Sequence, residues 1–306
     1  MAVDHIHLYK ARHRLTIVAS APPARLFFIN HIFYSIKEEN MKKLMLAVVA
    51  AGLAIGSSFA QADSGSRLYQ ILESGKLRMG VTLDWNPMSF RNPENNEMIG
   101  FDIDWGTQLA KDMGVEIEFV KTEWKTLLAG IVSDKYDISN SASLTPSRAK
   151  SVGFTDHYYE LGTVPLALTK NHSKYPTWES INKPEVTVAS TMGTVQEQQA
   201  KQYFPDAKHR VIEAPARDYQ EVLVGRADVH ITSNVEAVTL NQKFPELMAL
   251  PVTGRTNRPL GALLPQNDQI WINYVNHWIM AKKVAGFFDS LEAKWLVPEM
   301  EGLMKD

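Results

Sequence analysis

Stretches of strand-like composition alternate with stretches of helical periodicity from Lys76 onward. In the helical stretches apolar residues recur every three or four positions, whereas the strand-like stretches are short and rich in β-branched residues. The first series predicts strands at 77–83, 115–120 and 136–139, and helices at 101–113 and 124–133. This order is typical of an α/β fold that contains a parallel sheet.

A second series of the same kind follows the first. It predicts strands at 186–190, 210–213 and 229–233, and helices at 194–204 and 219–225. Two similar α/β units in one chain indicate two lobes.

Two apolar extended segments, 162–169 and 260–265, connect these units. Two crossings between lobes would form a hinge, and the helices predicted at 271–283 and 287–296 would return the chain to the first lobe. One unbroken sheet is the alternative. The expected boundaries are 63–163 and 264–306 for lobe 1, and 164–263 for lobe 2.

The region before residue 63 has the features of a leader. A charged start at 41–43 precedes an apolar run at 44–55, and Ala60-Gln61-Ala62 is a small-residue cleavage site. Because the run is short for a membrane span, a retained anchor is the minor alternative. We expect a signal peptide at 41–62, cleavage and export to the periplasm, and a non-native or misassigned extension at 1–40.

Composition excludes several kinds of chemistry. The chain has no cysteine, which rules out disulfides, thiol catalysis and cysteine-based zinc sites. Without residues 1–62 it holds 25 basic and 31 acidic residues, and this acidic balance argues against nucleic acid as a partner. Asp102 and Asp104 fit the first turn of a helix better than a cation site. We expect no metal and no cofactor.

The segment 139–148 carries the most specific chemistry. It contains four serines and Arg148 directly after a predicted strand. A guanidinium forks onto a carboxylate through two hydrogen bonds, and neighbouring serines can complete the shell around the same anion. Pro146 suits the first turn of a helix that would carry Arg148 inward. A serine-rich turn with a surface arginine is the alternative.

Several motifs, in their order and spacing, resemble the periplasmic solute-binding proteins of the amino-acid class that serve ABC importers. The likeness covers about residues 66–297. Its landmarks are Gly100-Phe-Asp-Ile-Asp104, Ser141 to Arg148 running into Phe154-Thr-Asp-His-Tyr158, Gly193-Thr-Val-Gln-Glu197, Gly225-Arg-Ala-Asp228, Tyr274-Val-Asn-His-Trp278 and Lys294-Trp295. The resemblance implies a monomer whose two lobes close on a small carboxylate-bearing solute and then dock on a membrane permease.

The resemblance also implies roles for individual residues. Arg148 would grip the ligand carboxylate with help from Ser141 and Ser143, and the helix near Thr194 would offer free amides to the same group. Aromatic side chains usually cover the ligand in such proteins. The expected site residues are Asp84, Trp85, Phe90, Trp124, Ser141, Ala142, Ser143, Arg148, Thr194, Val195, Ser233 and Asn234.

The chain departs from the family pattern after the strand at 229–233. The family commonly places an aspartate there to pair with the ligand ammonium group, whereas this chain has Ser233-Asn234. Burying an ammonium group without a charged partner is costly unless Glu236, Glu197 or Asp84 substitutes. A carboxylate that lacks the amine is therefore an alternative ligand.

A branch of the same fold, similar to cyclohexadienyl dehydratase, implies an alternative function. That branch eliminates water and carbon dioxide from prephenate or arogenate, which requires a carboxylic acid to protonate the departing hydroxyl. Glu197 lies at the matching position, although a glutamate in the first turn of a helix is also an ordinary capping residue. We expect a binding protein without catalytic residues, with a dehydratase that uses Glu197 as the alternative.

Overall fold

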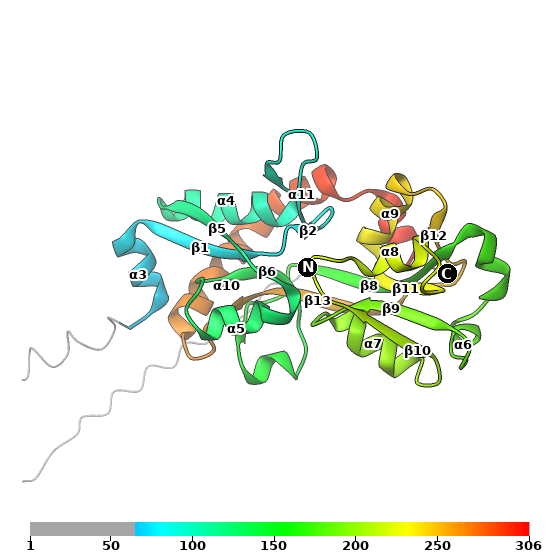
Figure 1. Cartoon of the computed structure of the whole chain (residues 1–306). Helices are drawn as coiled ribbons and strands as arrows, with labels where there is room; N and C mark the ends of the chain where they lie inside the picture. Colours follow the sequence, from blue (N-terminus) through cyan, green and yellow to red (C-terminus); the bar gives the residue numbers. More distant parts are fainter. Residues whose placement is uncertain (1–64, 306) are drawn as a thin grey trace, which may run out of the picture. The chain divides into compact units, whose positions relative to one another are not determined.

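A computed structural model describes residues 65–305 of the chain (Figure 1). The extension expected at 1–40 and the signal peptide expected at 41–62 lie outside the described residues, so both stay predictions. Within the described part, no helix combines the length and the apolar character that a membrane span requires.

Lobe 1 begins with a mixed α/β unit. Its elements are α3 (Arg67–Ser74), β1 (Lys76–Val81), β2 (Asp84–Trp85), β3 (Ser89–Arg91), β4 (Met98–Ile99), α4 (Phe101–Met113), β5 (Glu116–Lys121), η1 (Trp124–Thr126), α5 (Leu127–Val132), β6 (Ser139–Ser143), η2 (Arg148–Lys150) and β7 (Gly153–Phe154). β1 and β5 pair in parallel, and Met79 of β1 bridges to Ile138 just before β6. The predicted alternation of strand and helix is therefore present.

Helix α4 begins and ends at the predicted residues. Phe101, Trp105 and Leu109 recur at every fourth position and are fully buried, because this spacing places them on one face of a helix. Gly114 ends the helix in the left-handed conformation, with φ at 70°, which glycine adopts without steric cost.

Lobe 2 repeats the α/β pattern. Its elements are η3 (Thr169–Lys174), α6 (Trp178–Ile181), β9 (Thr187–Thr191), α7 (Val195–Tyr203), β10 (Lys208–Ile212), α8 (Asp218–Leu223), β11 (Val229–Ser233), α9 (Asn234–Lys243) and β12 (Leu247–Ala249). β9 pairs in parallel with both β10 and β11. Helices α7 and α8 pack on β9, which places the starts of both helices near the strand ends.

The two expected crossings are β8 (Tyr159–Leu168) and β13 (Arg255–Leu264), which pair with each other as antiparallel strands. β8 also pairs with β11 of lobe 2, and β13 pairs with β6 of lobe 1, so one sheet continues from lobe to lobe (Figure 1). The crossings and the continuous sheet are thus both present. Lobe 1 resumes before the predicted residue 264, because Leu260–Leu264 already pair with β6 and β7.

The C-terminal helices α10 (Gln269–Val284) and α11 (Phe287–Trp295) return to lobe 1, as predicted. Trp278 of α10 packs against Trp105 of α4 with ring centroids 5.0 Å apart. The chain then leaves lobe 1, because α12 (Pro298–Gly302) packs on α9 of lobe 2. We call residues 298–304 the C-terminal strap. Its position differs from the expectation that all of 264–306 belongs to lobe 1.

The serine-rich segment also differs from its expected form. β6 covers Ser139–Ser143, whereas the predicted strand ended at residue 139, and all five of its residues are buried. Pairing with β13 overrides the turn-like composition. Pro146 begins no α-helix, but the 3₁₀ turn η2 still buries Arg148.

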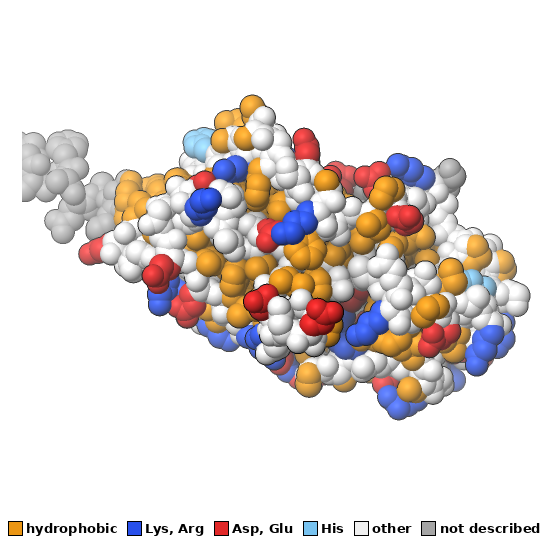
Figure 2. All heavy atoms as spheres, turned by 90° about the horizontal axis from the view of Figure 1, so that it is seen from above, with side chains coloured by type: hydrophobic (Ala, Val, Ile, Leu, Met, Phe, Trp, Pro, Cys, Tyr) orange, Lys and Arg blue, Asp and Glu red, His pale blue; other side chains and the backbone are white. Residues whose placement is uncertain are grey.

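Acidic and basic side chains are interspersed on the face shown in Figure 2. Asp104 of α4 forms one charge pair of the molecule, since its carboxylate lies 2.6 Å from the Lys294 ammonium group. Exposed pairs of this kind each contribute about 0–1 kcal/mol. Asp104 is therefore a surface ion-pairing residue in the first turn of its helix.

Candidate functional site

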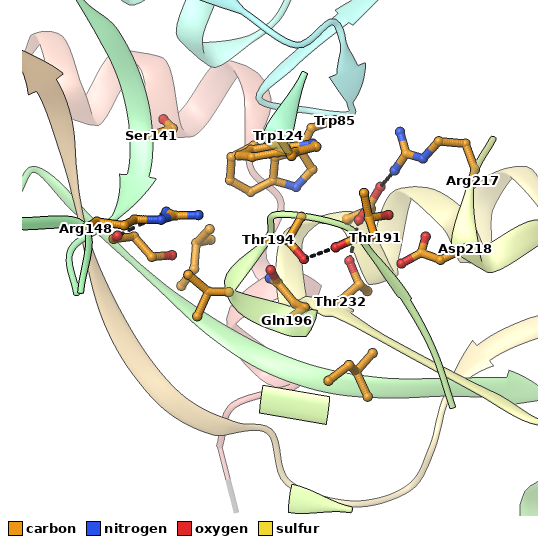
Figure 3. Close-up of a pocket in the computed structure, with 15 residues that line it drawn as sticks. Trp85, Trp124, Ser141, Arg148, Thr191, Thr194, Gln196, Arg217, Asp218 and Thr232 are labelled. Carbon is orange, nitrogen blue, oxygen red and sulfur yellow. Dashed lines mark hydrogen bonds and ion pairs between the residues drawn. The ribbon is translucent and has the colours of Figure 1, made fainter. Parts of the chain in front are cut away.

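A pocket between the two lobes brings together seven of the twelve expected site residues (Figure 3). It encloses about 510 Å³, open solvent included. Its lining consists of Trp85, Trp124, Ser141, Ser143, Arg148 and Leu161 from lobe 1 and β8, and of Thr191, Thr194, Val195, Gln196, Arg217, Asp218, Ile231, Thr232 and Glu236 from lobe 2. Asp84, Phe90, Ala142, Ser233 and Asn234 lie outside this lining.

Arg148 lies at one end of the pocket without an acidic partner (Figure 3). Its side chain donates to the carbonyl oxygen of Ser143 at 3.2 Å and, across the cleft, to that of Gly193 at 3.3 Å. Among the described residues, no carboxylate lies within ion-pair distance of Arg148. Burial lowers the pKa of Arg148 to about 10, so the guanidinium remains charged at neutral pH and uncompensated.

A second buried arginine, Arg258 of β13, lies on the other side of Ser143. Its Nε donates to the Ser143 hydroxyl at 3.3 Å, and Nη1 donates to Thr163 at 2.6 Å. Its Nη2 is buried and finds no hydrogen-bond acceptor among the described residues. Burial, with Arg148 adding to it, lowers the pKa of Arg258 to about 10. Sequence reasoning missed Arg258, because an arginine in a strand carries no signal of its own.

The three expected residues of β6 have different surroundings. Ser141 has a positive φ of 51°; its hydroxyl donates to Asp102 and its backbone N–H to the Tyr158 hydroxyl. Ser143 is already bonded to both buried arginines. Ala142 points into the hydrophobic core. Ser141 therefore offers a ligand less free hydrogen-bonding capacity than the sequence suggested.

The start of α7 faces the pocket from lobe 2. Thr194 is the N-cap, and its hydroxyl accepts the backbone N–H of Glu197 at 3.2 Å. Gly193 has φ at 81°, and a Cβ placed there would lie 2.5 Å from Cα of Lys125 in lobe 1. The two lobes thus touch backbone to backbone beside Arg148, at a helix end that favours anions.

Glu197 lies beside the pocket rather than in its lining. Its carboxylate accepts the Gly193 N–H at 2.9 Å and the Lys201 ammonium group at 2.6 Å. Burial alone would raise its pKa, but these bonds and the charge of Lys201 lower it overall. Glu197 therefore has the surroundings of an ionised helix-end residue.

Two tryptophans cover the pocket from lobe 1. The rings of Trp85 and Trp124 meet edge to face, with centroids 5.4 Å apart. Trp124 Nε1 donates to Asp84 at 3.2 Å, so Asp84 orients this ring from outside the lining. Phe90 packs instead against Trp295, with centroids 6.0 Å apart. Among the expected aromatic residues, the pocket therefore contains both tryptophans but not Phe90.

Ser233 and Asn234 connect parts of the chain behind the pocket. Ser233 is fully buried and caps α9, and its hydroxyl accepts Trp85 Nε1 of lobe 1 at 3.2 Å. Asn234 accepts the Gly162 N–H at 3.1 Å and donates to the Met300 carbonyl of the C-terminal strap at 2.7 Å. Their internal bonds account for both residues without a ligand.

Opposite Arg148, the pocket ends in a cluster of charges that sequence reasoning did not find as a unit. Arg217 bonds to Glu236 and Asp84, while Asp218 Oδ2 lies 3.1 Å from His230 Nδ1. Burial would raise the pKa of Asp218, but His230 and Arg217 lower it to about 2. In the sequence Asp218 and Glu236 look like ordinary first-turn residues of helices, and only the folded chain brings them together with Asp84 of β2.

The described residues contain no cluster of three or more histidine, aspartate or glutamate side chains that could hold a metal ion. The backbone carbonyl of His157 accepts a hydrogen bond from Lys283, and His157 does not line the pocket. The polar groups that line the pocket belong to arginines, hydroxyl residues, carboxylates, Gln196 and two tryptophans.

Comparison with known proteins gives one consistent group. A model of "Bacterial extracellular solute-binding proteins, family 3" matches residues 77–298. Cyclohexadienyl dehydratase of Pseudomonas aeruginosa is 29% identical over 252 residues, which cover 82% of this chain and 94% of that protein. The L-cystine-binding protein TcyJ of Escherichia coli is 25% identical over 255 residues, covering 83% of this chain and 95% of the relative.

A solved structure agrees with these relatives. The crystal structure of an ancestral amino acid-binding protein, described as a precursor of cyclohexadienyl dehydratase, matches with a TM-score of 0.71 and 37% identity. The match covers 76% of this chain and all of that one. A two-lobe α/β fold is thus common to both.

Proposed function

Because the chain belongs to family 3 of the bacterial extracellular solute-binding proteins, we propose that it captures a small carboxylate-bearing solute, an amino acid or an analogue of one, for an ABC importer. Relatives include proteins named for binding cystine, arginine and glutamine. Export through a cleaved signal peptide, a periplasmic location, a monomeric state and docking on a membrane permease are parts of the same proposal.

The observation that carries the proposal is the uncompensated Arg148 in the pocket. A buried guanidinium without a carboxylate is costly, and a ligand carboxylate offsets that cost through paired, charge-assisted hydrogen bonds. The start of α7 lies across the cleft, where the helix dipole supports the same negative group. A bound anion therefore interacts favourably with Arg148 in lobe 1 and with the start of α7 in lobe 2.

A thermal-shift screen of residues 63–306 tests the proposal. Amino acids, 2-oxo acids, small carboxylates and prephenate are compared with uncharged analogues of equal size. A solute at 100 times its Kd stabilises the folded protein by about 2.7 kcal/mol, because it binds only the folded state. We expect a carboxylate among the strongest hits. Stabilisation by the uncharged analogues as well as by the acids would contradict the assignment.

Cyclohexadienyl dehydratase activity is the second candidate, because one relative bears that name. A proton donor must hold its proton near neutral pH, whereas the bonds from Lys201 and Gly193 lower the pKa of Glu197. This contrast supports binding over catalysis. Absorbance of phenylpyruvate, followed in the prephenate sample, measures the competing activity directly.

The variant Glu197→Gln separates the two candidates. Its carboxamide can still accept the Gly193 N–H, so we expect ligand affinity to change by less than about threefold, or about 0.6 kcal/mol. Isothermal titration with the strongest hit measures the change, and Lys201→Gln serves as the control that removes only the ion pair. Phenylpyruvate formation by the wild type that vanishes in Glu197→Gln would instead establish the enzyme.

A further inference from the structure

Arg258 of β13 lies behind the end of the pocket that Arg148 occupies. It is only 6% exposed and does not belong to the pocket lining. Its Nε donates at 3.3 Å to the hydroxyl of Ser143, which does line the pocket. Ser143 therefore connects Arg258 to the space in which Arg148 would hold a ligand.

The hydroxyl group of Ser143 has a hydrogen that the protein does not use. A serine hydroxyl donates one hydrogen and accepts on its oxygen. The Ser143 hydroxyl accepts from Arg258, and the backbone carbonyl of Ser143 accepts from Arg148. Among the described residues, no acceptor takes the hydroxyl hydrogen of Ser143. The other lining serine has no such spare hydrogen, because Ser141 donates its hydroxyl to Asp102.

Bonds on the far side of Arg258 fix the direction of its guanidinium. Nη1 donates to the Thr163 hydroxyl of β8 at 2.6 Å, and Thr163 donates in turn to Gln199 of α7 at 2.7 Å. Thr163 is fully buried and Gln199 is 5% exposed, so water competes little for these bonds. The guanidinium is thus held between Thr163 and Ser143, with Nε aimed at the serine.

Arg258 also places a second positive charge at this end of the pocket. Among the described residues, no carboxylate lies within ion-pair distance of Arg148 or Arg258. Burial, with the charge of Arg148 adding to it, lowers the pKa of Arg258 to about 10, so both guanidinium groups are charged at neutral pH. A charged donor polarises the hydroxyl that it bonds, and this strengthens the hydrogen bond that the hydroxyl donates onward.

We propose that Arg258 is a positioning residue of the carboxylate site, which holds and polarises the Ser143 hydroxyl so that this hydroxyl donates to the same carboxylate as Arg148. The inference rests on the proposed function, because it assumes that Arg148 holds a carboxylate. One ligand oxygen then takes the spare hydrogen of Ser143, while the fork of Arg148 supplies the remaining donors. Arg258 acts on the ligand through Ser143 and does not touch it.

A double-mutant cycle tests the proposal. Wild type, Arg258→Met, Ser143→Ala and the double variant are each titrated calorimetrically with L-glutamine, L-arginine and prephenate, or with another acid that stabilises the protein in the thermal screen. We expect Arg258→Met to weaken binding of the acid at least about tenfold when Ser143 is present, and at most about threefold in the Ser143→Ala background. A purely structural effect on the strands would weaken binding equally in both backgrounds.

Arg255→Met is the matched control, because it removes another arginine from the same strand. The Arg255 side chain is 40% exposed, pairs with Glu179 at 2.9 Å and lies outside the pocket lining. We expect the affinity of this variant to stay within about twofold of wild type.

The outcomes separate this inference from the proposed function. Equal losses in the two backgrounds, or wild-type affinity in Ser143→Ala, overturn the role of Arg258 and leave a carboxylate site at Arg148 standing. Wild type that binds none of the acids overturns the proposed function as well. If Arg258→Met does not fold, as judged by circular dichroism, Arg258→Gln takes its place in the cycle, and the affinity of Ser143→Ala alone still decides whether the hydroxyl is used.

Discussion

Replacing Arg148 with alanine is expected to weaken binding of the native carboxylate ligand by more than about 2 kcal/mol, or about thirtyfold. The guanidinium is buried and has no carboxylate partner among the described residues, so a bound anion would meet a fully available charge. Removing it leaves the ligand carboxylate desolvated beside neutral groups, and that loss exceeds the value of one hydrogen bond.

Isothermal titration with the strongest hit of the thermal screen measures this effect. Arg148→Lys retains the charge but not the fork, and should recover part of the affinity. Lys150→Ala is the matched control, because Lys150 is an exposed residue of the same 3₁₀ turn. Wild-type affinity in Arg148→Ala would show that the carboxylate is held elsewhere.

The variant Asp102→Asn is expected to change how stability depends on pH. Asp102 is 4% exposed in the first turn of α4, and its carboxylate accepts the Ser141 hydroxyl. Burial raises its pKa from 3.8 to about 7, although the bond from Ser141 opposes that shift. A raised pKa means that the folded state keeps a proton which the unfolded state releases.

The sign of the effect follows from proton linkage. Below about pH 4 both states hold the proton, whereas between about pH 4 and pH 7 only the folded state does, so the free energy of unfolding falls as pH rises. At about 1.4 kcal/mol per pKa unit, the loss reaches at most about 4 kcal/mol above pH 7. Asp102→Asn removes this contribution and should be the more stable protein at pH 8, with nearly equal stability at pH 4.

Urea unfolding of both proteins at several values between pH 4 and pH 8 measures the difference. The other titrating groups are common to the two proteins, so their contributions cancel in the comparison. A difference in unfolding free energy that stays constant across this range would show that folding leaves the pKa of Asp102 unchanged.

Secondary structure was predictable where periodicity and end signals agree. Helix α4 has buried residues at every fourth position and a terminal glycine, and three of the five residues of β11 are β-branched, so both were predicted at their observed bounds. β6 was not, because serine favours turns and only pairing with β13 makes Ser139–Ser143 a strand. The packing of the C-terminal strap on lobe 2 was not predicted for a related reason, because the contacts of the strap join residues that are far apart in the chain.

The residues of the candidate site fall into the same two groups, those that local sequence predicts and those that it does not. Arg148 and the two tryptophans lie in motifs whose local sequence carries a chemical signal. Arg217 and Arg258 do not, because each acquires its role only from partners on other elements, such as Glu236 and Ser143. Single-sequence reasoning finds side chains that are unusual in their own segment and misses those that become unusual through folding.

The C-terminal strap makes a third connection between the lobes, beside β8 and β13. Its Met300 belongs to a hydrophobic cluster that contains residues of both lobes, such as Trp105 and Val235. The Met300 carbonyl accepts a bond from Asn234 of lobe 2, and Leu303 accepts the Gly254 N–H at 2.9 Å. A protein that binds only when its lobes are together has an apparent Kd equal to the intrinsic Kd divided by the fraction of molecules in that arrangement. Residues 298–304 therefore belong to the determinants of ligand affinity although none of them lines the pocket, and sequence changes there can tune uptake without altering what is recognised.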